Sequence, residues 1–136
     1  MFLPIIEKRE GAGGERETWV QFCDNEEPWL VRDHHWVGFD FDGVLSLPDS
    51  SKPYRMEDLG VPVPEMVEAA KRLIDAGITV KVFTARACDR EMVPKIQAWT
   101  KQNHLGKLEV TNTKDYEMVR FYDDRAIQVI VDFKNK

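Results

Sequence analysis

From Trp36 onward the apolar residues of the chain fall into short runs that alternate with longer amphipathic stretches. Each short run is rich in apolar or β-branched residues and stops at polar or turn-forming residues, which predicts a strand. The expected strands are residues 36–41, 78–84, 108–111, 118–122 and 126–131.

The two amphipathic stretches predict helices. Pro64 suits the first turn of one helix and Gly77 suits its C-terminal stop. The apolar residues of this helix, Val63, Met66, Val67, Ala70, Leu73 and Ile74, fall on one face. A second helix is expected over residues 94–106, with Ile96, Trp99 and Thr100 directed inward.

The order of these elements predicts the fold class. Strand, helix, strand, helix, strand is a βαβ rhythm, which is typical of a parallel sheet with helices on its faces. We therefore expect an α/β protein, a Rossmann-like three-layer α/β/α sandwich with a mostly parallel central sheet.

The N-terminal part has a different pattern. Residues 7–17 hold three glycines and seven charges, which predicts a mobile loop or tail. Residues 18–23 and 28–32 are short, contain tryptophan and are expected to form a hairpin or an edge strand. We expect an N-terminal extension over residues 1–35, partly flexible, and an α/β domain over residues 36–136.

Composition narrows the class of protein. The chain has 136 residues, which is the length of one domain, and its net charge of −5 argues against a general nucleic-acid binder, although a local basic groove stays open. Cys23 and Cys88 are too few for a disulfide scaffold and are expected to be reduced. No apolar run is long enough to span a membrane and the N-terminus lacks a signal-peptide pattern, so we expect a cytoplasmic protein with no membrane partner.

Polar residues follow the predicted strands, at the edge where open α/β sheets bind ligands. They are Asp40, Asp42 and Gly43 after the first strand, Thr84, Ala85 and Arg86 after the second, Lys114 beyond the third, and Asp123, Asp124 and Arg125 after the fourth. Clustered carboxylates repel one another unless a cation lies between them, and Mg²⁺ prefers such oxygen ligands.

This set of residue types suits phosphoryl transfer. One aspartate could attack phosphorus to give an aspartyl-phosphate, and the other could protonate the leaving oxygen and then deprotonate water. Thr84 could donate a hydrogen bond to a phosphate oxygen, and Lys114 could neutralise charge on the nucleophile and the phosphate. Arg86 and Arg125 either bind substrate phosphate or pair with neighbouring acids.

At these positions the sequence resembles the haloacid dehalogenase (HAD) superfamily. The run Val37-Gly-Phe-Asp40-Phe-Asp42-Gly43-Val-Leu resembles the first motif, and Val80-Lys-Val-Phe-Thr84-Ala-Arg resembles the second. Lys114 would be the third-motif lysine, and Phe121-Tyr-Asp-Asp124-Arg resembles the acidic fourth motif. The resemblance covers about residues 36–131 and implies a HAD-like fold and Mg²⁺-dependent phosphomonoester hydrolysis.

The resemblance also implies roles. Asp40 would be the nucleophile and a metal ligand, and Asp42 the general acid/base, with its backbone carbonyl on the metal. Asp123 would be a further metal anchor, with Asp124 a ligand directly, through water or as a supporting partner. Thr84 and Lys114 would hold the phosphate, beside Gly43, Ala85 and Arg86. An acid at position 42 is typical of the phosphatase branch rather than of dehalogenases.

Two departures from the family's pattern bear on these roles. Lys114 lies only nine residues before Asp123, closer than is usual, so Lys107 is the alternative third-motif residue. The intervals between the motifs are too short for a cap domain, which implies an open site and a macromolecular or nucleotide phosphate as substrate. Residues 122–129 also resemble polynucleotide 3′-phosphatase domains, so a polynucleotide end is one candidate partner.

Other interpretations stay open. Response-regulator receiver domains share similar residue types, but in them the acidic pair comes first along the chain. The alternative function is a phosphate-binding or regulatory module, receiver-like or catalytically silent, that does not turn over a substrate. His34-His35 suggests a metal site, but no third ligand is spaced to join the pair. Trp19, Trp29 and Trp36 are interpreted as packing residues.

Overall fold

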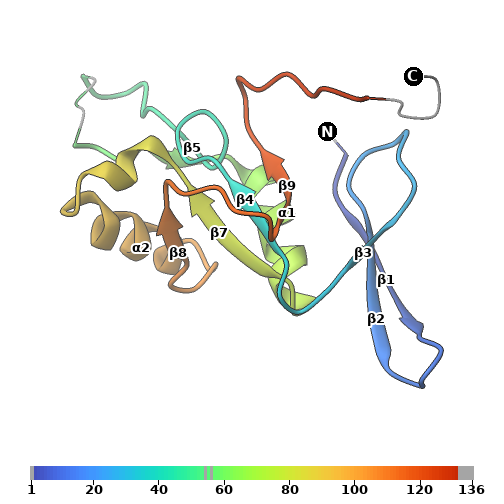
Figure 1. Cartoon of the computed structure of the whole chain (residues 1–136). Coiled ribbons are helices and arrows are strands. Elements are labelled where there is room, and N and C mark those ends of the chain that lie inside the picture. The colour runs from blue at the N-terminus through green and yellow to red at the C-terminus, as the bar shows by residue number, and fades with distance from the viewer. Residues whose placement is uncertain (1, 54, 56, 132–136) are drawn as a thin grey trace.

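The structure is a computed structural model that describes residues 2–53, 55 and 57–131, and its strands form three separate sheets (Figure 1). The N-terminal sheet is antiparallel, in the order β1-β2-β3. Its strands are β1 (Ile5–Glu10), β2 (Arg16–Gln21) and β3 (Trp29–Val31). The predicted hairpin between residues 18–23 and 28–32 is confirmed, because Thr18 pairs with Val31.

The second sheet is parallel and has the order β8-β7-β4-β9. Its strands are β4 (Trp36–Phe39), β7 (Thr79–Phe83), β8 (Glu109–Thr111) and β9 (Met118–Tyr122). Four of the five predicted strands are therefore confirmed, as is their parallel pairing. All four carboxyl ends lie at one edge of the sheet.

Two α-helices connect the strands of this sheet, as predicted. Helix α1 (Pro64–Asp75) begins at its proline. It is followed by Gly77, which has a φ of 87°, the left-handed conformation in which a glycine commonly ends a helix. Helix α2 (Met92–Gln102) begins two residues before Pro94 and buries Ile96 and Trp99. A short 3₁₀ helix, η1 (Ala85–Cys88), follows β7.

The third sheet is a short antiparallel pair after the first aspartates. Strands β5 (Ser46–Leu47) and β6 (Val61–Pro62) pair antiparallel, which brings the two ends of the segment between them together. The pair lies near the carboxyl edge of the parallel sheet (Figure 1).

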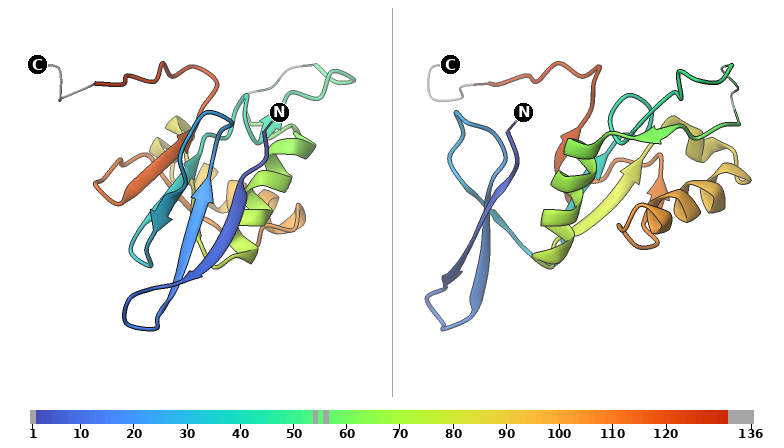
Figure 2. Two further views of the ribbon diagram at one scale, coloured as in Figure 1. Left: turned by 90° about the vertical axis from the view of Figure 1, so that its right-hand side faces the viewer. Right: turned by 180° about the vertical axis from the view of Figure 1, so that it is seen from behind.

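One hydrophobic core lies between the parallel sheet and the two helices. Val37 and Phe39 of β4 point into this core beside Val80 and Val82 of β7, and each of these four residues is at most 5% exposed. The helices contribute Ala69, Ala70 and Leu73 from α1, and Met92, Ile96 and Trp99 from α2. Both helices therefore cover the same face of the sheet, as the view from behind shows (Figure 2).

The predicted three-layer α/β/α sandwich is wrong, and with it the Rossmann-like and HAD-like fold. The described residues form three sheets, two of them antiparallel, and only two α-helices. The connection from β8 to β9 spans only residues 112–117. It is too short to contain a helix that could cover the second face of the parallel sheet, which is the face opposite α1 and α2.

The second face is covered instead by this connection and by aromatic side chains. The indole Nε1 of Trp36 donates to Asp115 Oδ1 at 2.9 Å, which holds residues 112–117 across the sheet. The ring of Phe83 lies 4.9 Å from that of Phe121 and 6.4 Å from that of Trp36. Trp36 is therefore a packing residue, as predicted.

Two local predictions are also wrong. Residues 126–131 form no strand, and the side chains of Ile127, Val129 and Ile130 are 79–89% exposed. Their apolar pattern suits a strand, but no described strand pairs with this segment. Residues 7–17 are not a loop throughout, because Glu7–Glu10 and Arg16–Glu17 pair across a turn.

Arg120 of β9 contacts the N-terminal sheet, which also contributes Val20 and Val31 to the hydrophobic core. Arg120 donates to Glu26 and, at 3.1 Å, to Cys23 Sγ. Its guanidinium carbon also lies 5.4 Å from the ring centroid of Phe22 and 5.3 Å from that of Trp29. These contacts fix the N-terminal sheet beside the edge strand of the parallel sheet.

Within the part of the chain that the structure describes, neither helix has the length and apolar character needed to cross a bilayer.

Candidate functional site

Three carboxylates meet where β4 and β9 end. These strands are adjacent and parallel, with Phe39 opposite Tyr122, so the residues that follow them lie side by side. The amide of Asp40 donates to the carbonyl of Tyr122 at 2.9 Å. Carboxylate oxygens of Asp40, Asp123 and Asp124 all lie within 4.8 Å of one another.

The environment of Asp40 disfavours its charged form. The pKa of the Asp40 carboxyl is raised to about 6, and burial is the largest cause. The hydrogen bond that Phe41 N–H donates to this carboxyl at 2.8 Å lowers the pKa, whereas a hydrogen bond with Asp123 and the charges of Asp123 and Asp124 raise it. A cation among these oxygens would offset the repulsion, and an all-oxygen donor set suits Mg²⁺.

Gly43 lies against the cluster and leaves room for one of its members. Its φ is 84°, and a Cβ built on it would lie 2.2 Å from Asp124 Oδ2. A larger residue would therefore displace the Asp124 carboxylate. The turn after β4 needs glycine both for its backbone conformation and for this close approach.

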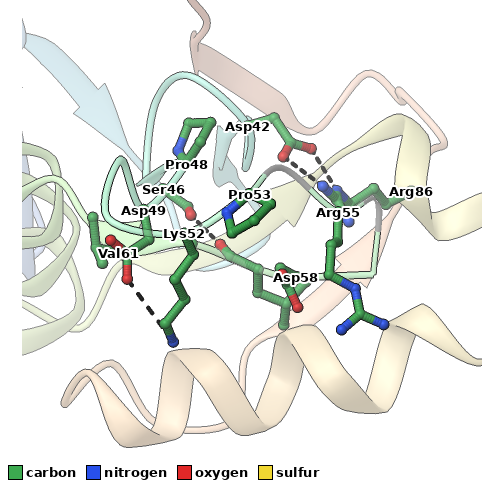
Figure 3. A pocket seen from close by; sticks show the side chains of 12 residues that line it. Asp42, Ser46, Pro48, Asp49, Lys52, Pro53, Arg55, Asp58, Val61 and Arg86 are labelled. Atoms are coloured by element: carbon green, nitrogen blue, oxygen red, sulfur yellow. Dashed lines mark hydrogen bonds and ion pairs between the residues drawn. The ribbon is translucent and has the colours of Figure 1, made fainter.

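Asp42 does not point into the cluster of three carboxylates. Both of its carboxylate oxygens accept hydrogen bonds from Arg86, from Nε to Oδ2 at 2.7 Å and from Nη2 to Oδ1 at 2.9 Å (Figure 3). The side chain of Arg86 is 14% exposed and that of Asp42 is 55% exposed. The structure thus places Asp42 in a bidentate ion pair beside the cluster.

Thr84 and Ala85 lie at the end of β7, next to β4. Thr84 is buried, its amide donates to the Thr111 carbonyl at 2.9 Å, and its Oγ1 accepts from Arg86 N–H at 3.2 Å. This hydroxyl caps η1, which begins at the exposed Ala85. The Thr84 hydroxyl keeps its proton for donation to another acceptor.

The two candidate lysines lie at opposite ends of β8. Lys107 precedes the strand and is therefore at the amino edge of the sheet, away from Asp40. Lys114 follows the strand and lines a groove of about 640 Å³ together with Asp123. Of the two, only Lys114 is on the side of the carboxylates. Arg125 is exposed just beyond Asp124.

The histidine pair acquires a third neighbour that the sequence did not indicate. His34 Nε2 lies 3.4 Å from Glu117 Oε2, and ligand atoms of His34, His35 and Glu117 lie within 4.8 Å of one another. His35 Nδ1 accepts a hydrogen bond from Arg32 N–H at 3.0 Å, so one nitrogen of this ring is already engaged. Burial lowers the pKa of His35, and the neighbouring His34 lowers it further. This group is at the amino end of β4, opposite the carboxylates.

Sequence reasoning also missed the Arg120–Glu26 contact. These residues are separated by 94 positions, and Arg120 looks in the sequence like an ordinary polar residue of a strand. No local signal could therefore have indicated the pairing. Cys23, which lies beside them, and Cys88 are both unpaired thiols, as expected.

Comparisons of the chain with protein-family models, with curated proteins and with solved structures find no match.

Proposed function

We propose that this protein hydrolyses phosphomonoesters with the help of Mg²⁺, through an aspartyl-phosphate on Asp40. The observation that carries the proposal is the convergence of Asp40, Asp123 and Asp124 at the carboxyl ends of two parallel strands. The motif order along the chain, which resembles that of HAD phosphatases, agrees with this chemistry.

Asp40, Asp123 and Asp124 are the residues that would hold the metal. Their oxygens fit Mg²⁺, since a divalent cation would neutralise the charges that raise the pKa of Asp40. When bound, Mg²⁺ would shield the phosphate from the attacking carboxylate.

In the first chemical step, an Asp40 carboxylate oxygen attacks phosphorus and the bond from phosphorus to the ester oxygen breaks. Asp42 gives a proton to that oxygen, and the alcohol leaves. Water then attacks the aspartyl-phosphate and Asp42 takes its proton. The bond from phosphorus to Asp40 breaks, so inorganic phosphate leaves and Asp40 is regenerated.

Arg86 would couple substrate binding to the freeing of Asp42. Arginine binds a phosphate and a carboxylate with the same bidentate geometry, so an incoming phosphate competes with Asp42 for the Arg86 guanidinium. Thr84 O–H and Lys114 Nζ would donate to the remaining phosphate oxygens. The exposed Asp42 can then turn toward the ester oxygen.

The experiment is hydrolysis of p-nitrophenyl phosphate with and without Mg²⁺, with wild type beside Asp40→Asn and the exposed α1 variant Asp75→Asn as control. We expect Mg²⁺-dependent release in wild type and in Asp75→Asn, and at least a roughly 1,000-fold loss in Asp40→Asn, as for removal of a catalytic nucleophile. EDTA should abolish release reversibly. Mg²⁺-dependent release that persists in Asp40→Asn would contradict the proposed nucleophile.

The bidentate hold of Arg86 on Asp42 favours one alternative, a regulatory module that binds phosphate and does not turn it over. Such a protein would bind beryllofluoride with Mg²⁺ and lose this binding in Asp40→Asn, yet would hydrolyse neither p-nitrophenyl phosphate nor a panel of nucleotide, sugar and 3′-phosphorylated oligonucleotide esters. Turnover of any of these esters that requires Asp40 favours the hydrolase.

We further propose that the protein works in the cytoplasm. The unpaired thiols of Cys23 and Cys88 are both exposed, which suits a reducing compartment.

A further inference from the structure

Two histidines and a glutamate meet at the amino edge of the parallel sheet, away from the cluster of three carboxylates. His34 and His35 precede β4, and Glu117 precedes β9. Because Trp36 lies opposite Met118 in these paired strands, the residues just before the two strands lie side by side. Ligand atoms of His34, His35 and Glu117 therefore gather within 4.8 Å of one another.

The spacing within this group matches that of ligands on one tetrahedral ion. His34 Nε2 lies 3.4 Å from Glu117 Oε2, which is longer than the roughly 2.7–3.2 Å of an N–H···O hydrogen bond. A nitrogen and an oxygen that each lie about 2.1 Å from a tetrahedral Zn²⁺ ion are about 3.4 Å apart. The ring centroids of His34 and His35 are 4.3 Å apart, so the second imidazole lies beside the first.

Backbone hydrogen bonds hold both of the segments that carry these ligands. The Trp36 amide donates to the Glu117 carbonyl at 2.8 Å, and the Glu117 amide donates to Asp115 Oδ1 at 2.9 Å. The same carboxylate oxygen accepts from Trp36 Nε1 at 2.9 Å. The His35 amide donates to the Arg32 carbonyl at 3.0 Å, which closes the turn before β4. The backbone beneath the three side chains is therefore fixed before an ion binds.

An ion can reach these side chains from solvent, because those of His34 and Glu117 are 59% and 47% exposed. One existing contact must be released. His35 Nδ1 accepts from Arg32 N–H at 3.0 Å, and a metal on either ring nitrogen ends this contact, since Nδ1 then binds the metal or carries the ring proton. Arg32 is exposed, so its amide can donate to water instead.

We propose that His34, His35 and Glu117 bind Zn²⁺, which links the turn between the N-terminal sheet and β4 to the segment before β9. Two imidazoles and a carboxylate are common ligands of Zn²⁺, whereas the all-oxygen cluster at the carboxyl edge suits Mg²⁺. Water completes the coordination of the ion. The two groups are at opposite edges of the sheet, so this inference does not depend on the proposed hydrolysis.

The test is calorimetric titration of the full chain with Zn²⁺, with excess Mg²⁺ present to compete at the carboxylate cluster. Every protein carries Cys23→Ser and Cys88→Ser, because the two exposed thiols would otherwise compete for Zn²⁺. We expect one ion per chain. His34→Ala and Glu117→Gln should each weaken binding at least about 10-fold, since even a lost supporting partner costs a metal site that much. Co²⁺ should give the visible absorption of a four-coordinate ion, and both variants should lose it.

The matched control is His104→Asn, which removes the third histidine of the chain. His104 is exposed and has a φ of 67°, a conformation that asparagine tolerates. Its Zn²⁺ affinity should equal that of the parent. Zn²⁺ should also speed hydrogen exchange at the Arg32 amide in the parent and leave it unchanged in His34→Ala. Absence of saturable binding, an affinity that survives both His34→Ala and Glu117→Gln, or an equal loss in His104→Asn would each overturn the inference.

Discussion

Gly43 lies directly against the Asp124 carboxylate, so close that a Cβ on Gly43 would be 2.2 Å from Oδ2. We expect Gly43→Ala to push this carboxylate out of the cluster and to weaken Mg²⁺ binding about 10-fold. The positive φ of Gly43 should add a loss of about 1 kcal/mol in the free energy of unfolding. Calorimetric titration with Mg²⁺ and urea unfolding measure the two effects.

Gly106→Ala is the matched control for this prediction. Gly106 has a φ of 76°, and a Cβ there would meet nothing within 4 Å. It should lose about the same free energy of unfolding as Gly43→Ala, about 1 kcal/mol, and keep wild-type Mg²⁺ affinity. Equal Mg²⁺ affinity in the two variants would contradict the prediction that a Cβ at Gly43 displaces the Asp124 carboxylate from the metal-binding cluster.

In the absence of divalent cations, Asp40→Asn should stabilise the protein. The folded-state pKa of Asp40 is raised to about 6, so the folded protein holds a proton that the unfolded chain releases near pH 4. The contribution of Asp40 to the free energy of unfolding is fully present below pH 4 and is lost as pH rises through 6. At pH 7.5 in EDTA we expect the Asp40→Asn variant to gain about 1 kcal/mol, after discounting for solvent screening of this half-buried group.

Urea unfolding of wild type and Asp40→Asn at pH 4.5 and pH 7.5 checks the sign. The difference between the two proteins should shrink at pH 4.5, and Mg²⁺ at pH 7.5 should cancel or reverse it by stabilising wild type. Asp75→Asn, on the exposed surface of α1, should show no such pattern. A stabilisation equal at both pH values would mean that Asp40 carries no unfavourable charge in the folded protein.

Arg86→Ala should raise KM for p-nitrophenyl phosphate about 10-fold, because the proposed phosphate loses a bidentate partner. Arg86→Lys should recover only part of this loss, since an ammonium group cannot form the paired contact that Arg86 makes with Asp42. Steady-state kinetics at saturating Mg²⁺ provide the measurement, with the exposed Arg90→Ala as control. A wild-type KM in Arg86→Ala would contradict a role for this arginine in binding the phosphate.

Arg120→Met should lower the free energy of unfolding by about 2 kcal/mol, because it leaves Glu26 without its cation in a mostly buried place. The double variant with Glu26→Gln should recover part of that loss. Urea unfolding measures both, and hydrogen exchange should show faster opening of β1, β2 and β3. Arg72→Met, which removes an exposed pair with Glu68, should cost about 0.5 kcal/mol; an equal cost for both would contradict the anchoring role.

Several elements could be predicted because their signals are local. The spacing of apolar residues between Pro64 and Gly77 predicted α1, and the β-branched run before Thr84 predicted β7. The βαβ rhythm then predicted parallel pairing, which is enough to bring Asp40 beside Asp123 and Asp124, since parallel strands end at one edge.

The sequence by itself thus determined the helices, the strands of the parallel sheet and the edge at which the polar residues gather. Tertiary structure decided that residues 112–117 cross the second face without a helix, that Arg86 holds Asp42, and that Arg120 joins the N-terminal sheet to β9. Local periodicity reports which face of an element is apolar, but it carries no information about which distant side chain will meet that face. Such contacts depend on packing between segments up to 97 positions apart, and only the folded chain brings them together.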